Sequence, residues 1–426
     1  MSGFRWLVPL TSGPPPVIAG AKAARLSSAL LAGFRVLPGW VLPVAAGRPA
    51  IGAGVAAIRA DGVAAGRRAV LGYPLEPALA GELETAVTRL RGRVIVRSSS
   101  PLEADPRWSG AFSSVAEVGP ADVAAAVRSC LASVLAPDPL RRLDSCGLPL
   151  EAAELAVLLQ PEISPVAGGT ARVTTQPDGD IEVTVEGLAG HPGALLAGAA
   201  DGATARFRGG AIALTGGNGL VSLIGAEHAR AVAELAMGVC RVLGDDLIEW
   251  ALWQGEIWLL QSLRERPRSP AAPDDSPDAV AAGPPGAHPR PAPHASVLAL
   301  AEAIRASGRP VPAIAAAPGA TAGRLVACRP HEPATPDCRD AVLLIDRPLA
   351  AYAPLLFAAR GVISAAGPAS SHLATVARSL GVPMVVGCPV AAVTAGYPPA
   401  SEWLAALDGG TGDVRVMAGH AVSCSP

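Results

Sequence analysis

The stretch GPASSHLATVAR, residues 367–378, decides how the C-terminal part of this 426-residue chain folds. Ser370 or Ser371 can cap the helix that follows, which places His372 in its first turn. The positive end of the helix dipole lowers the pKa of an imidazole there, so His372 would stay neutral and nucleophilic. A phosphate attached to it would meet the free N–H groups of that turn. The alternative interpretation is a purely structural cap.

The residues around this stretch predict a compact α/β unit, because short apolar runs alternate with helical spacing. One helix is expected at residues 296–307, ahead of the unit. The expected strands and helices of the unit are residues 341–345, 361–363, 383–386 and 414–417, and residues 355–359 and 370–380, respectively.

A proline-rich segment precedes this unit. Residues 267–295 combine proline with Ala, Gly, Ser and Asp and contain almost no large apolar side chains. Such a composition cannot bury a core and is typical of an extended, semi-rigid linker.

The N-terminal part has a mixed pattern. The expected elements are strands at residues 94–96 and 155–160, hairpins at residues 172–185 and 247–260, and helices at residues 23–31, 122–135 and 227–243. The sequence therefore predicts a multidomain protein of the α/β (α+β) class. Its expected parts are a large domain at residues 1–266, a linker at 267–295 and a small domain at 296–426.

Lys22 is the single lysine among the 34 basic residues of the chain. It follows the small residues Ala19, Gly20 and Ala21 at the predicted start of a helix. Small residues let backbone N–H groups approach an anion, and a compact ammonium group suits a phosphate as a point charge. A lone lysine can also arise by chance in an arginine-rich chain, so the motif alone is weak.

The strand at residues 94–96 ends in Arg97 and Ser98, followed by two further serines. A cation and hydroxyl groups at the end of a buried strand are typical of nucleotide sites. The simpler alternative is a serine-rich turn with a surface arginine.

Glu249 and Gln261 lie on the two strands of the second hairpin, which turns at Gln254 and Gly255. The two side chains could therefore lie near one another across the strands. A carboxylate and an amide oxygen, completed by triphosphate oxygens, suit Mg²⁺. Otherwise, Glu249 is a solvated strand residue and Gln261 a hydrogen-bonding residue at a strand end.

Composition excludes several classes of function. The formal net charge is −2, which does not favour a nucleic-acid-binding protein. The apolar run at residues 379–401 is interrupted by four prolines, so no membrane span is expected there, and the N-terminus lacks the pattern of a signal peptide. Seven cysteines without a CxxC pair indicate reduced thiols. We expect a cytoplasmic protein without a membrane or nucleic-acid partner.

Together and in this order, the motifs resemble those of the phosphoenolpyruvate synthase and pyruvate phosphate dikinase family, which includes rifampicin phosphotransferase. The matching segments are residues 19–23, 36–40, 96–99, 247–250, 260–261 and 367–378. Each match is modest alone, but their order along most of the chain is specific.

The resemblance implies an ATP-grasp nucleotide-binding domain and a small swivelling domain that carries a phosphohistidine between two sites. By this resemblance Lys22, Arg97 and Ser98 bind ATP, Glu249 and Gln261 bind Mg²⁺, and His372 accepts and donates the phosphoryl group. ATP would end as AMP, with one phosphate released and the other passed to an acceptor.

The chain departs from the family pattern at two places. Family members often have Arg two residues after the glutamine, whereas this chain has Leu263 there and Arg264 one residue later, which could substitute for it. The barrel that binds phosphoenolpyruvate or pyruvate has no counterpart in the sequence, nor does a long domain ahead of the histidine segment.

Three hypotheses follow. The leading one is a dikinase-like phosphotransferase of specialised metabolism. Its acceptor is a small molecule of unknown identity with a hydroxyl or carboxyl group. The second is a phosphoryl carrier whose acceptor domain is a separate protein. The third is an ATP-binding pseudoenzyme.

Overall fold

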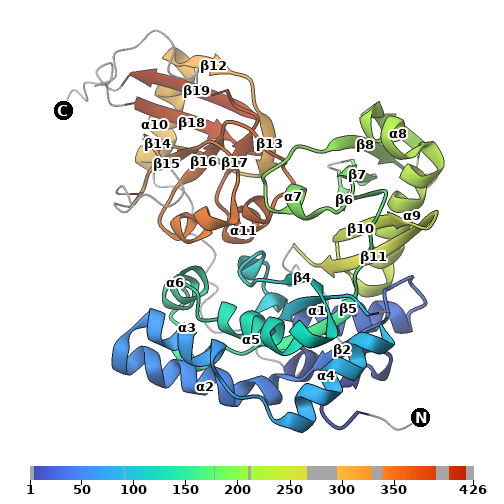
Figure 1. Ribbon diagram of the computed structural model, residues 1–426. Helices are drawn as coiled ribbons and strands as arrows, with labels where there is room; N and C mark the ends of the chain where they lie inside the picture. Colours follow the sequence, from blue (N-terminus) through green and yellow to red (C-terminus); the bar gives the residue numbers. More distant parts are fainter. Residues whose placement is uncertain are drawn as a thin grey trace, which may run out of the picture.

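The computed structural model describes residues 4–90, 92–176, 178–209, 213–265, 295–328, 338–389 and 403–418. These residues form three β-sheets with helices around them (Figure 1). The mixed α/β class expected from the sequence is confirmed. The expected linker, residues 267–295, lies outside the described residues except for Ala295, so it stays a prediction, as do the domain boundaries.

The first sheet has the strand order β1-β2-β5-β3-β4. Residues on β5 alternate between two cores, because successive side chains of a strand point to opposite faces. Val157 and Leu159 pack into one core with helices of the N-terminal half, whereas Ala156 and Leu158 face the core beneath α1. Its strands are β1 (Val8–Pro9), β2 (Trp40–Leu42), β3 (Val94–Ser99), β4 (Val115–Val118) and β5 (Ala156–Pro161).

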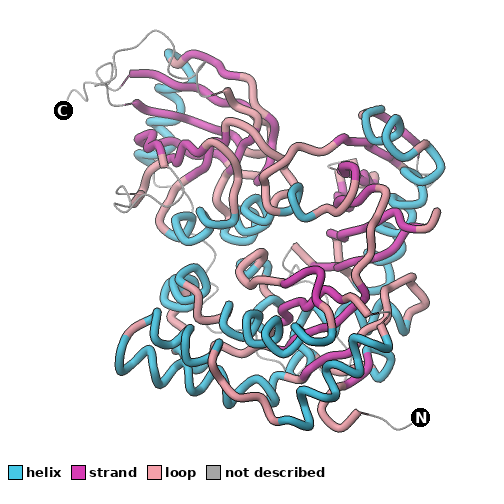
Figure 2. The backbone as a smooth tube through the Cα atoms, viewed as in Figure 1, coloured by secondary structure: helices cyan, strands magenta, loops and turns pink. Residues whose placement is uncertain are grey.

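Helices cover both faces of this sheet and dominate the lower half of the molecule in Figure 2. They are α1 (Pro16–Leu31), α2 (Val44–Asp61), α3 (Val63–Leu71), α4 (Pro77–Arg89), α5 (Val123–Ser133) and α6 (Pro137–Ser145). The short 3₁₀ helices are η1 (Leu10–Ser12), η2 (Pro101–Ala104), η3 (Pro106–Trp108), η4 (Pro120–Asp122) and η5 (Leu150–Ala152).

The second sheet is antiparallel, with the order β11-β10-β6-β7-β8-β9. Both predicted hairpins belong to it, and they are confirmed as β6 with β7 and β10 with β11. Gln254 and Gly255 have φ values of 53° and 76°, the conformation that a tight two-residue hairpin turn requires. The strands are β6 (Ala167–Thr175), β7 (Ile181–Ala189), β8 (Ala203–Arg208), β9 (Ala213–Gly216), β10 (Leu247–Trp253) and β11 (Glu256–Leu263), with helices α7 (Gly193–Leu196), α8 (Asn218–Ile224) and α9 (Ala226–Leu243).

The third sheet has the order β12-β19-β18-β14-β15-β16-β17-β13, and β14 to β17 run parallel. Along β15, Leu343 and Ile345 face the core beneath α11, whereas Val342 and Leu344 face the opposite core. The strands are β12 (Arg309–Val311), β13 (Ile314–Ala317), β14 (Ala320–Ala327), β15 (Val342–Ile345), β16 (Gly361–Ser364), β17 (Met384–Val386), β18 (Trp403–Asp408) and β19 (Asp413–Ala418), with α10 (Ala295–Ser307), η6 (Ala350–Phe357) and α11 (His372–Leu380).

Two features of the third unit differ from the sequence-based expectation. The predicted helix at residues 355–359 is instead the 3₁₀ helix η6, which contains Pro354. Proline lacks the N–H that a longer α-helix needs, so the shorter type of turn is favoured. The strands β12, β13, β14 and β18 were not expected, because their short runs rich in alanine and arginine carry no clear two-residue alternation.

The stretch Pro120–Ser145 contains an 18-residue window that is apolar enough by composition to cross a membrane, with a mean hydropathy of 1.3. The stretch spans η4, α5 and α6, and 56% of that window is buried inside the protein. A core helix of a globular domain has the same composition, and Val123, Val127 and Leu131 of this stretch pack into the first core.

Candidate functional site

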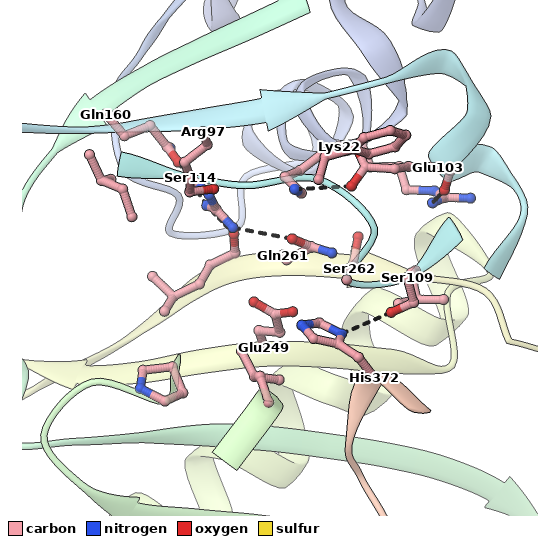
Figure 3. Close-up of a pocket in the computed structure, with 18 of the residues that line it drawn as sticks. Lys22, Arg97, Glu103, Ser109, Ser114, Gln160, Glu249, Gln261, Ser262 and His372 are labelled. Carbon is pink, nitrogen blue, oxygen red and sulfur yellow. Dashed lines mark hydrogen bonds and ion pairs between the residues drawn. The ribbon is translucent and has the colours of Figure 1, made fainter. Parts of the chain in front are cut away.

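A cavity of about 200 Å³ lies between the first sheet, the second sheet and the start of α11, and its walls come from both ends of the chain. Its lining includes Lys22 and Arg97 from the first unit, Glu249 and Gln261 from the second, and His372 from the third. Figure 3 shows these five side chains around one space. The structure thus brings together five of the seven residues that the sequence singled out.

Lys22 lies just after a break in α1. Gly20 has φ 72° and ψ 165°, so the regular helix restarts beyond it, as expected from the sequence. A side chain at position 20 would collide with the Ser99 carbonyl oxygen, 1.9 Å from an added Cβ, so the close approach of α1 to β3 requires glycine. The Lys22 ammonium donates to the Ser98 carbonyl oxygen at 2.9 Å and pairs with Glu103 at 3.1 Å.

The first N–H groups of this helix do not face the cavity. Ala21 N–H donates to the Ser100 carbonyl oxygen at 3.0 Å, and Ala23 N–H donates to Ser99 Oγ at 3.0 Å. The amides of Ala21 and Ala23 are therefore not available to an anion. Ser99 and Ser100 engage them, and α1 contributes the side chains of Lys22 and Arg25 to the cavity.

Arg97 bridges the first and second sheets. One guanidinium nitrogen donates to Gln160 Oε1 at 3.0 Å and to the Leu260 carbonyl oxygen at 2.8 Å, and the other donates to Gln261 Oε1 at 3.1 Å. Burial lowers the pKa of this guanidinium, and the nearby carboxylates of Glu249 and Glu103 act against that shift. Arg97 therefore holds a positive charge in a dry setting, where it attracts anions strongly.

Glu249 and Gln261 are directly paired across β10 and β11, which confirms their predicted proximity. Burial raises the pKa of the Glu249 carboxyl, whereas Arg97 and Lys22 act to lower it. Within the described residues, no hydrogen bond or ion pair holds that carboxylate. A desolvated carboxylate next to an amide oxygen fits a hard divalent cation such as Mg²⁺, which triphosphate oxygens would complete.

His372 is the first residue of α11, and Ser371 caps that helix by accepting a hydrogen bond from Ala374 N–H at 3.3 Å. Nδ1 of His372 lies 2.9 Å from Ser109 Oγ. In Figure 3 the other ring nitrogen points toward Glu249. Burial lowers the pKa of His372 to about 4, and the positive charges of Lys22 and Arg142 add to this effect. The predicted direction is confirmed, although burial rather than the helix dipole is the main cause.

Arg142 supports the loop at residues 107–110, which contacts His372. Arg142 on α6 is fully buried and donates to the carbonyl oxygens of Arg107 at 2.8 Å and Ser109 at 3.1 Å. The next residue, Gly110, has φ 67°, and a Cβ added there would lie 2.9 Å from three atoms of His372. The imidazole therefore packs directly on the backbone of this loop.

Further contacts bind the third unit to the second. Glu265 accepts hydrogen bonds from Thr375 Oγ1 at 2.6 Å and from Arg378 at 2.8 Å, and pairs with Arg172 at 3.2 Å. Burial favours the neutral acid, but the two arginines outweigh it and hold the pKa of Glu265 to about 2. Ser370 donates to Glu186 on β7. The structure thus describes a state in which His372 is docked at the cavity.

Ser98 and Arg264 do not line the cavity. The Ser98 side chain is fully buried, and only its carbonyl oxygen contributes, through Lys22. Arg264 donates to the carbonyl oxygens of Gly244 at 2.7 Å and Leu243 at 3.2 Å, so its guanidinium caps the end of α9. Position 263 does line the cavity, with the apolar side chain of Leu263.

Sequence reasoning did not assign Gly110, Arg142 or Glu265. Their roles depend on contacts between residues far apart in the chain, for which the sequence carries no local signal. Likewise, nothing in the sequence shows that Ser109 contacts His372.

This arrangement can perform one kind of chemistry well. Three cations, Lys22, Arg25 and Arg97, and the carboxylate of Glu249 line a space that also contains the neutral imidazole of His372. Positioning and charge stabilisation are what phosphoryl transfer needs from a protein.

Comparisons with known proteins agree with this geometry. Residues 18–204 match the family described as pyruvate phosphate dikinase, AMP/ATP-binding domain, and residues 338–412 match the PEP-utilising enzyme, mobile domain. No curated protein matches the chain.

Two solved structures resemble the chain only weakly, and their TM-scores are too low to indicate a shared fold or function. The C-terminally truncated Cdc123 from Schizosaccharomyces pombe is 11% identical over 58% of this chain and 84% of its own, with a TM-score of 0.28. The holo-form of aconitase X from Thermococcus kodakaraensis is 14% identical over 26% of this chain and 99% of its own, with a TM-score of 0.20.

The family matches extend from the ATP-binding domain, which is of the ATP-grasp type, to the mobile domain that contains His372. The chain therefore belongs to the phosphoenolpyruvate synthase and pyruvate phosphate dikinase family, and is an ATP-dependent, dikinase-like phosphotransferase with a phosphohistidine domain.

Proposed function

We propose that ATP phosphorylates His372, with AMP and phosphate as products, and that the phosphohistidine then passes its phosphoryl group to the hydroxyl or carboxyl group of a small molecule. The observation that carries this proposal is the position of His372. A residue of the mobile domain lines the same cavity as Lys22, Arg97, Glu249 and Gln261.

The first half-reaction consumes ATP and water and yields AMP, phosphate and phosphohistidine. A bond forms between Nε2 of His372 and the β phosphorus of ATP as the α–β phosphoanhydride bond breaks and AMP leaves. Water then cleaves the β–γ phosphoanhydride bond, which releases phosphate. Ser109 Oγ, 2.9 Å from Nδ1, would accept a hydrogen bond from Nδ1–H and so leave the lone pair on Nε2. The low pKa of His372 keeps the ring uncharged at neutral pH.

Lys22 and Arg97 would hold the phosphates of ATP, and Glu249 with Gln261 would bind Mg²⁺. When bound, Mg²⁺ neutralises phosphate charge and orients the reacting phosphoryl group. The protein side chains keep the site dry and fix the imidazole against Gly110.

In the second half-reaction an acceptor oxygen attacks the phosphorus and the N–P bond breaks, which restores neutral His372. We propose residues 1–266 as the ATP-binding domain, 267–295 as the linker and 296–426 as the carrier domain. A cytoplasmic location would give the enzyme access to ATP, and it agrees with the absence of disulfides among the described cysteines.

The decisive test is incubation of the purified protein with Mg²⁺ and ATP labelled at the β or γ phosphate, followed by intact mass and nucleotide analysis. We expect one acid-labile phosphoryl group on His372 and release of AMP. His372→Ala would abolish the label, whereas His228→Ala, on α9 away from the cavity, would keep it. Bound ATP without any label would instead favour an ATP-binding pseudoenzyme.

The acceptor is then sought by chasing labelled protein with candidate hydroxyl and carboxyl compounds. Loss of label to a small molecule in the purified system supports the proposal. Label that leaves His372 only after a second protein is added would identify the chain as a phosphoryl carrier for that protein.

A further inference from the structure

A third cation, Arg25, lines the cavity together with Lys22 and Arg97. It lies three residues after Lys22 on α1, and residues three apart occupy neighbouring positions on one face of a helix. α1 therefore presents two cations, separated by about one helical turn, to the space that we assign to ATP.

The guanidinium of Arg25 has donors left for a ligand. It donates to the carbonyl oxygens of Glu103 at 3.2 Å and Ala104 at 3.3 Å, which are long bonds to neutral acceptors. Its contact with Asp245 is longer still, at 3.9 Å. Arginine has five N–H donors in a planar fork, and the side chain is 23% exposed. These two bonds thus leave part of the fork available to a ligand.

Arg25 also lies next to the end of β11. Asp245, its distant partner, accepts a hydrogen bond from Ser262 Oγ at 2.7 Å. The next residue on that strand is Leu263, which lines the same cavity with an apolar side chain. The end of β11 therefore supplies no positive charge to the cavity, whereas α1 supplies the guanidinium of Arg25.

We propose that Arg25 is a further binding residue of this site, and that its guanidinium contacts the phosphate chain of ATP on the side of the cavity bounded by Leu263. Planar, bidentate recognition of phosphate oxygens is what arginine does best. The inference rests on the proposed function for the identity of the ligand, but not on transfer to His372.

The test measures the affinity of the full chain for MgATP, for tripolyphosphate and for adenosine by calorimetry. Arg25→Ala is expected to weaken binding of MgATP and tripolyphosphate about tenfold, the order of one charge-assisted contact, and to leave adenosine unaffected. Arg59→Ala is the matched control, because that arginine is 61% exposed on α2 and remote from the cavity.

A second variant separates direct binding from loop support. Arg25 also holds the carbonyl groups of residues 103–104, so its loss could act through the Lys22–Glu103 pair. If Arg25 contacts phosphate, Leu263→Arg in the Arg25→Ala background returns a guanidinium to the same wall and restores tripolyphosphate affinity. Equal weakening of all three ligands without such rescue would overturn the inference.

The outcomes also separate this inference from the proposed function. If wild-type protein takes no label on His372 but binds tripolyphosphate with an affinity that depends on Arg25, the inference stands and the proposed reaction fails. If wild-type protein is labelled and Arg25→Ala binds tripolyphosphate normally, the inference fails alone.

Discussion

Ser109 Oγ lies 2.9 Å from Nδ1 of His372, across 263 positions of sequence. This single contact joins the ATP-binding part of the chain to the mobile part at the reactive group itself. It also fixes which ring nitrogen remains available, because a nitrogen engaged with the serine hydroxyl cannot attack phosphorus.

Ser109→Ala removes the partner of Nδ1. We expect single-turnover phosphorylation of His372 to slow about tenfold, because the imidazole loses the contact that orients it and selects its tautomer. Affinity for MgATP should stay unchanged. Rapid quench with labelled ATP measures the rate, and Ser113→Ala, an exposed serine four residues on, is the control. An unaltered rate would show that the contact has no role in transfer.

Gly110→Ala places a Cβ 2.9 Å from the His372 ring. The carrier domain cannot dock without displacement, so phosphorylation should fall at least tenfold while MgATP still binds. The matched control is Gly147→Ala. Gly147 has φ 65°, close to the 67° of Gly110, and nothing lies within 4 Å of its added Cβ. Both variants bear the same backbone strain, so equal effects on transfer would contradict the steric explanation.

The docked state should weaken in acid. Docking holds the pKa of His372 to about 4, below its ordinary value of 6.5. As the pH falls below 6.5, the undocked imidazole becomes protonated, whereas the docked imidazole stays neutral. Docking is therefore favoured above pH 6.5 and is lost progressively toward pH 4. Histidine-labelled NMR, with His372→Asn for assignment, should give an apparent pKa between these two values. An apparent pKa above 6.5 would contradict the docked environment described above.

Glu265→Gln leaves Arg172 and Arg378 without their shared carboxylate. Loss of one partner from a buried ion-pair network is strongly destabilising, about 3–5 kcal/mol, so the docked state should open. Small-angle scattering should show a larger radius of gyration, and phosphorylation should slow. Glu256→Gln is the control, since Glu256 pairs with Arg35 at the surface and is 57% exposed. An unchanged radius would mean that other contacts suffice.

Much of this site was predictable from sequence because each segment carries a local signal. A lone lysine at a helix start, an arginine at a strand end and a serine-capped histidine each have a recognisable pattern. The proximity of Glu249 and Gln261 followed from the position of the turn at Gln254 and Gly255. Their direct pairing depends on a register shift between Glu249 and Trp250, which the turn does not predict.

What escaped prediction depends on tertiary contacts. Nothing near Arg264 in sequence shows that α9 ends beside it, so its capping role emerged only from the fold. The amides at the start of α1 were expected to approach an anion, yet the close approach at Gly20 lets Ser99 and Ser100 accept hydrogen bonds from two of them. Likewise, residues 367–378 reveal a capped histidine but not the loop at Ser109 on which it rests.

Glu265 is the last residue described before residue 295, and it is bound on one side by Arg172 of β6 and on the other by Arg378 of α11. In the proposed function, the carrier domain is therefore held by ion pairs at the residue that precedes the proposed linker. While these ion pairs are intact, they set the effective concentration of the imidazole at the nucleotide. Insertions into the proposed linker are then expected to alter how fast a released carrier domain returns, and not the pose that it returns to.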